Sequence, residues 1–175
     1  LNQTWDPVLA RKEQIQNKAM QLWKDAVSAE QKIDLDLEER AAHIEKLHKD
    51  IDAAKEQVKY FSGEQDALKE KYGIEEESQE QQDLELLLKQ RKARKPSNQP
   101  GMIEFSEEEL ERLKELEEQP LTEYQSRYLE LESAKGIYQE EINACNKECL
   151  KESKIITGIK LERLKSHALA DAQEK

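Results

Sequence analysis

Cysteine and histidine are the side chains of this sequence best able to bind zinc. Cys145 and Cys149 are four residues apart, which places both thiols on one face of a helix. A structural zinc site needs four ligands, so two more must come from elsewhere. His43 and His48 are five apart and point to nearly opposite sides of a helix, and His167 is distant. The spacing therefore favours two buried cysteines, and we expect no metal and no cofactor.

A second group with chemical potential is basic. Five cations fall within the seven positions 89–95, namely Lys89, Arg91, Lys92, Arg94 and Lys95. They form a candidate partner-binding segment, either for nuclear import or for contact with phosphate or an acidic partner. Cations at a helix C-terminus also interact favourably with its dipole. No aromatic residue interrupts the run, so it lacks the stacking platform of a single-stranded nucleic-acid site.

An acidic segment follows the basic one. Residues 96–119 contain eight acidic and two basic side chains. Carboxylates on a helix cannot surround calcium as an EF-hand loop does, so we interpret them as an acidic surface. The favoured interpretation is that the helix predicted at 107–118 pairs with the basic segment 89–95 inside the chain.

The sequence contains no recognised catalytic motif. No Ser-His-Asp set, Gly-rich phosphate loop or HExxH motif is present. Tyr124, Tyr128 and Tyr138 are spaced as core residues. We therefore expect a protein that is not an enzyme.

The elements that position these residues are predicted by heptad spacing. Apolar side chains recur in steps of three, four and seven at Leu37, Ile44, Leu47, Ile51, Ala54, Val58, Phe61, Leu68 and Tyr72. A similar series begins at Leu121 and extends to Ile159. Each stripe needs a partner helix to keep it from water.

Helix boundaries follow from capping residues and from glycine and proline. Asp6-Pro7 is a typical helix start, and no Gly or Pro follows until Gly63. We predict one arm helix over 7–61 and a second over 121–173. Ser62 and Gly63 form a candidate hinge between the first arm and the tip.

The predicted tip, residues 62–119, contains short helices and one loop. Gly73 is a predicted helix stop, and a helix is expected from about Ser78 to Ala93. A loop over 95–106 contains two prolines. Ser106 and Glu109 have the spacing of a capping box that starts the next helix.

These elements predict an all-α fold, a long antiparallel coiled-coil hairpin with two helices of about 50 residues and a small helical head at its tip. Residues 1–175 would form a single extended helical domain. The expected register places Trp23 near Ile159 and Ile44 near Tyr138. A parallel homodimer, in which each stripe meets its own copy, is the alternative.

Composition limits the class of partner. The chain has 175 residues, 36% hydrophobic and 38% charged, with a net charge of −11. The low apolar fraction favours an extended bundle, and the negative charge makes nucleic acid an unfavourable partner. No segment is apolar enough to insert in a membrane. Without a signal peptide or a disulfide framework, a cytoplasmic location is favoured.

The function expected from these patterns is that of a non-enzymatic structural or interaction module. It would be a coiled-coil arm or scaffold that binds a protein partner, within a longer protein. One alternative is an acidic-surface protein whose basic segment 89–95 docks a polyanion or nucleic acid. Another is a homo-oligomeric coiled coil for assembly or secretion.

Overall fold

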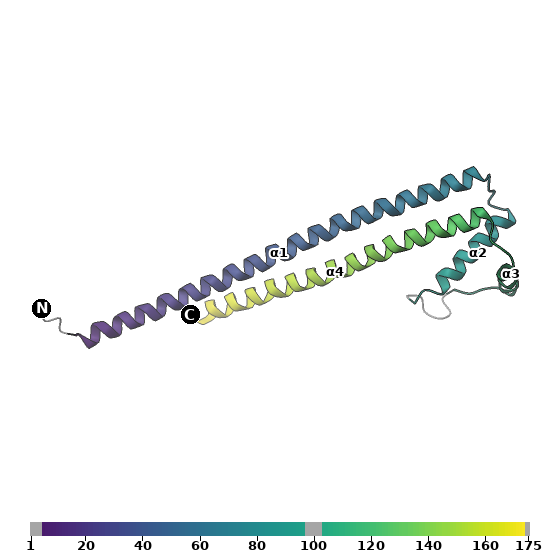
Figure 1. Cartoon of the computed structure of the whole chain (residues 1–175). Helices are drawn as coiled ribbons and strands as arrows, with labels where there is room; N and C mark the ends of the chain where they lie inside the picture. The colour runs from purple at the N-terminus through teal and green to yellow at the C-terminus, as the bar shows by residue number, and fades with distance from the viewer. Residues whose placement is uncertain (1–4, 97–102, 174–175) are drawn as a thin grey trace. The chain divides into compact units, whose positions relative to one another are not determined.

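The protein is an all-α helical hairpin. The computed structural model describes residues 5–96 and 103–173. The described helices are α1 (Pro7–Lys71), α2 (Gln79–Ala93), α3 (Glu107–Glu117) and α4 (Glu123–Gln173), and α1 packs antiparallel to α4 (Figure 1). The predicted fold class is therefore confirmed.

Contacts between residues divide the chain into two compact units. One combines Leu1–Lys49 with Cys145–Lys175, and we call it the two-helix unit because α1 and α4 alone build its described part. The other is Asp50–Ala144, here the four-helix unit, to which every described helix contributes. The single domain expected over residues 1–175 stays a prediction.

The first arm helix is longer than the sequence suggested. The prediction that it ends at 61 is wrong, because α1 passes through Ser62 and Gly63 as regular helix and ends at Lys71. A glycine inside a helix costs about 1 kcal/mol relative to alanine. Leu68, which follows in the seam, packs against the core cluster around Leu84, and this apolar contact offsets that cost. A hinge role for Ser62 and Gly63 stays a prediction.

The end of α1 confirms the predicted stop at Gly73. This glycine has a φ of 58°, the left-handed conformation that side chains disfavour. The amide of Gly73 donates to the carbonyl of Glu70, and the amide of Ile74 donates to that of Lys69. The two bonds form a Schellman motif, which satisfies carbonyls that the helix end would leave free.

Polar pairs fix the register of the two-helix unit. The Nη1 of Arg40 lies 3.1 Å from the Oε1 of Glu152. Arg163 contacts Glu30 at 3.0 Å and Asp34 at 2.7 Å. Among the described apolar residues of this unit, Leu47 is the most buried, at 8% exposure.

The predicted register is wrong by about two heptads. Trp23 was expected near Ile159, yet it is 63% exposed. Tyr138 was expected near Ile44, yet its ring stacks on Phe61 with centroids 6.0 Å apart. The predicted register assumed that the first arm helix ends at residue 61. Because α1 continues to Lys71, the midpoint of the hairpin lies later in the chain, and each residue of α1 faces a later residue of α4. A two-heptad shift keeps apolar residues opposite apolar residues, so the seam alone could not reveal the error.

The core of the four-helix unit is built around α2. Leu84 is completely buried and packs with Tyr124 and Leu129. A second cluster joins α2 to α3 through Leu86, Leu113 and Leu116. As predicted, Ser106 and Glu109 form the capping box that starts α3. Of the predicted loop 95–106, residues 97–102 lie outside the described residues and the others are not helical.

Candidate functional site

The basic segment 89–95 lies at the C-terminal end of α2, in the four-helix unit. Lys89 contacts Glu109 of α3 at 3.0 Å, and its ammonium lies 4.9 Å from the ring centroid of Phe105. The carboxylate of Glu109 has a lowered pKa, chiefly because Lys89 donates to it and also because the Ser106 amide does. The expected pairing of the basic segment with the acidic helix is therefore made at this position.

The next cation of the segment pairs differently. Arg91 donates from Nη1 to the carbonyl of Leu129, at 3.2 Å, and to the hydroxyl of Ser133, at 3.0 Å. Both acceptors are neutral, so these bonds position the guanidinium on α4 without cancelling its charge. Arg94 and Lys95 directly follow the last residue of α2, and both are exposed. The segment thus keeps a net positive charge towards solvent.

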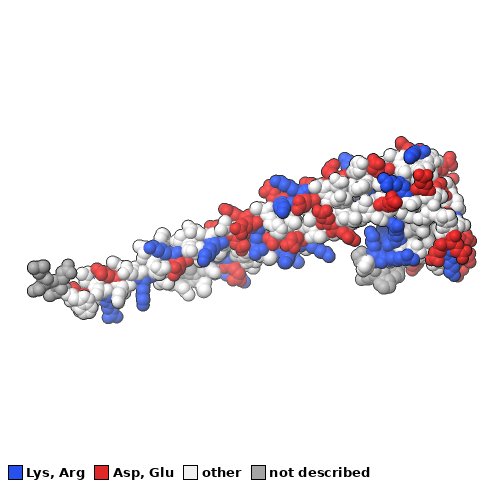
Figure 2. Space-filling view, viewed as in Figure 1, with Lys and Arg blue, Asp and Glu red and all other residues white. Residues whose placement is uncertain are grey.

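A groove runs between the end of α2 and α4. Its volume is about 780 Å³. Leu88 and Ile137 provide apolar surface, and Ile137 is 67% exposed. The charged lining residues are Glu85, Lys89, Arg91, Lys92, Lys95, Glu132 and Glu140. In Figure 2, Lys and Arg gather near the C-terminal end of α2, while Asp and Glu gather over α3.

A buried ion pair holds α3 against α2. The Nε and Nη2 of Arg112 each lie 2.8 Å from one carboxylate oxygen of Asp83, a bidentate geometry. Asp83 is buried, and the bonds from Arg112 lower its pKa. This pair orients the helix that supplies Glu109 to Lys89. No sequence signal predicted this pair, because neither residue belongs to an obvious motif.

Tyr124 is a core residue rather than a reactive one, in agreement with its heptad spacing. Its hydroxyl donates to the Oε1 of Gln81 at 2.8 Å, and its side chain is 1% exposed. Burial raises the pKa of Tyr124 to about 12. The phenol therefore stays protonated and acts as a hydrogen-bond donor inside the core.

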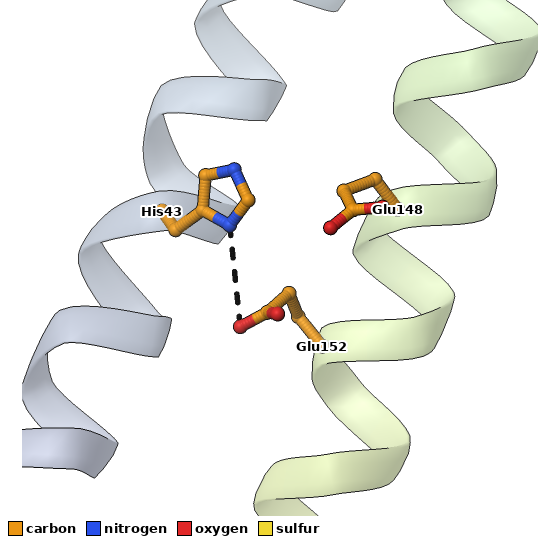
Figure 3. A group of neighbouring side chains, drawn as sticks. All are labelled: His43, Glu148 and Glu152. Carbon is orange, nitrogen blue, oxygen red and sulfur yellow. Dashed lines mark ion pairs between the residues drawn. The ribbon is translucent and has the colours of Figure 1, made fainter.

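One group of side chains in the two-helix unit has the composition of a metal site. Figure 3 shows His43 of α1 pointing towards Glu148 and Glu152 of α4. The potential ligand atoms of the three residues all lie within 4.8 Å of one another. The Nδ1 of His43 is 4.0 Å from a carboxylate oxygen of Glu152. The sequence alone could not pair His43 with these glutamates, because their meeting depends on the register of α1 against α4.

The cysteines do not join this group. Cys145 and Cys149 are both half-buried on α4. Among the described residues, the group of His43 with Glu148 and Glu152 is the one that brings potential metal ligands together. The expectation that the cysteines are seam residues agrees with their partial burial.

Comparison of the chain with protein-family models, with curated proteins and with solved structures finds no match. Among the described residues, no helix combines the length and the apolar composition that crossing a membrane requires.

Proposed function

We propose that this chain is a non-enzymatic interaction module, a coiled-coil hairpin whose four-helix unit binds an acidic amphipathic helix of a protein partner. The observation that carries this proposal is the groove between α2 and α4, with apolar surface at Leu88 and Ile137 beside a row of cations. A partner helix could cover the apolar surface and place acidic side chains against α2.

The spacing of buried positions supports the coiled-coil part of the proposal. In α1 the least exposed residues recur in alternating steps of three and four, for example at Ile44, Leu47, Ile51 and Ala54. In α4 the same steps connect Cys145, Cys149 and Glu152. A seam between two helices covers only a narrow stripe of each, and such an interface does not enclose a deep pocket for a small molecule.

Charge supports an acidic partner over a neutral one. Arg91 is bonded to neutral acceptors, and Lys95 is exposed on the same wall of the groove. The opposite wall contributes Glu132, which already accepts a bond of 2.8 Å from Gln65, and the exposed Glu140. An incoming carboxylate is therefore attracted to the α2 wall, while the apolar surface of Ile137 selects against a fully hydrophilic polyanion.

Binding of synthetic peptides tests this function. Fluorescence anisotropy would compare acidic amphipathic helical peptides with sequence-scrambled peptides of the same charge. We expect the amphipathic peptides to bind more tightly, with affinity that falls as salt is raised. Ile137→Asp should abolish the binding.

Leu150→Asp is the matched control, because Leu150 is an exposed apolar residue of α4, at 57% exposure, that does not line the groove. Its binding should be unchanged. Equal binding of scrambled peptides, or of heparin and single-stranded DNA, would contradict the proposal and favour the polyanion alternative. A dimer in light scattering that Ile137→Asp dissociates would instead assign the groove to a second copy of the chain.

A further inference from the structure

The group of His43, Glu148 and Glu152 lies outside the groove and has no role in the proposed function. Glu148 and Glu152 are one helical turn apart on α4, so their carboxylates share a face. His43 approaches them from α1. Residues from two helices, far apart in sequence, thus bring one imidazole nitrogen and two carboxylates within 4.8 Å (Figure 3).

The donor types distinguish between metal ions. Calcium and magnesium prefer six or more oxygen ligands, and three side chains with one nitrogen do not provide them. Zinc commonly takes histidine nitrogen and carboxylate oxygen, and three protein ligands leave a fourth position for water. His43 is exposed, so water has access to that position.

Only side-chain rotation is needed to close such a site. Tetrahedral zinc with bonds of about 2.0–2.1 Å places neighbouring ligand atoms about 3.3 Å apart. His43 Nδ1 and the nearer Glu152 oxygen are 4.0 Å apart. The exposed imidazole and the half-buried Glu148 have room to rotate inward, while the backbone of both helices stays in place.

Glu152 is held for this role by a neighbour. Its side chain is 8% exposed, and Arg40 Nη1 lies 3.1 and 3.3 Å from its two oxygens. Arg40 also bonds Asp36 at 3.1 Å, so its charge is shared between two carboxylates. Arg40 therefore fixes the orientation of Glu152 as outer-sphere partners of metal ligands do.

We propose that His43, Glu148 and Glu152 bind one zinc ion that bridges α1 and α4 in the two-helix unit. The bound ion would add a cross-link between the helices where the apolar seam is thin. Because the ion binds the folded unit, zinc should also raise its thermal stability.

Zinc titration of the untagged full chain by calorimetry tests this site. The background protein carries Cys145→Ser and Cys149→Ser, which removes the thiols as competing ligands. We expect one zinc ion per chain and a rise in melting temperature. His43→Ala and Glu148→Gln should each weaken binding by about tenfold or more and remove the thermal shift.

His48→Ala is the matched control, because His48 is also exposed on α1 but does not belong to the group. Its zinc affinity should equal that of the background. Absence of stoichiometric binding in the background protein would overturn the site, and so would unchanged affinity in both ligand variants. Circular dichroism establishes that each variant retains its helices, so that a loss of binding reports on the ligands.

Discussion

The two units of this chain bury their side chains in different ways. In the four-helix unit, Leu84 and Tyr124 are at most 1% exposed, and both lie in a core reached from several helices. In the two-helix unit, the buried residues described are Leu47 and Glu152, one apolar and one charged. A pair of helices can shield only a narrow stripe, whereas additional helices cover the remaining sides of each core residue.

Stability and register specificity therefore originate in different units. Core side chains of the four-helix unit are more deeply buried, so each contributes more to the free energy of unfolding than a seam residue of the two-helix unit does. In the two-helix unit, ion pairs from Arg40 and Arg163 select the register. A shift by two heptads would place Tyr138 where Glu152 lies and leave Arg40 without that carboxylate.

The largest effect is expected in the core around α2. Leu84→Ala should reduce the free energy of unfolding by about 4–5 kcal/mol, the upper end of such truncations, because the site is fully enclosed and cannot relax. Urea denaturation followed by circular dichroism measures it. Leu150→Ala, at a position 57% exposed, is the control and should stay within about 0.5 kcal/mol. A comparable loss in both variants would contradict the core assigned here.

The second-largest loss of stability is expected from a change at Asp83, the buried carboxylate of the same unit. Asp83→Asn removes the charged acceptor of the two bonds from Arg112. We expect a loss of about 1.5–3 kcal/mol in the free energy of unfolding, the range for hydrogen bonds to charged groups. An unchanged urea midpoint would show that the pair does not hold α3 to α2.

The lowered pKa of Asp83 also predicts a pH dependence. Bonds from Arg112 lower the folded-state pKa below the unfolded value. The resulting stabilisation is therefore complete above the unfolded pKa of about 3.9 and is lost as the pH falls through the folded pKa. Melting temperatures between pH 6 and pH 2 should fall more steeply in the original protein than in Asp83→Asn. Parallel curves for the two proteins would be evidence against this coupling.

Truncation in the two-helix unit should cost less than in the four-helix core. Leu47→Ala is expected to lower the free energy of unfolding by about 2 kcal/mol, the lower end of the range, because water can reach the gap between two helices. The same urea experiment measures it. A loss equal to that of Leu84→Ala would remove the distinction between the units.

The smallest effect is expected at the start of α1. Trp23 is 63% exposed, so Trp23→Ala should change the free energy of unfolding by no more than about 0.5 kcal/mol. A loss above about 2 kcal/mol would instead indicate that Trp23 is packed in a core, as a contact with Ile159 would require.

The sequence predicted the fold class because heptad spacing and capping residues act locally. The start of α1 at Pro7, its stop at Gly73 and the capping box of Ser106 and Glu109 follow from such short-range rules. Gly63 misled the prediction because its cost is small beside the burial of the seam that continues past it.

The candidate sites were harder to predict because they depend on register. Glu152 meets His43 and Arg40 only in one alignment of α1 with α4, and the apolar seam fits several. The pair of Asp83 and Arg112 depends in turn on how α3 packs against α2. The basic segment 89–95 as a whole was expected to pair with the acidic helix; Lys89 does so, whereas Arg91 donates to α4.

Native-state hydrogen exchange compares the stability of the two units directly, because it reports local stability along the whole chain. We predict that amides of α2, Gln79–Ala93, exchange only through unfolding with a free energy close to the global value. Amides of residues 11–23 of α1 should exchange through local opening, several orders of magnitude faster. Equal protection of the two segments would contradict the account, since it would require the start of α1 to be covered as completely as the core around Leu84.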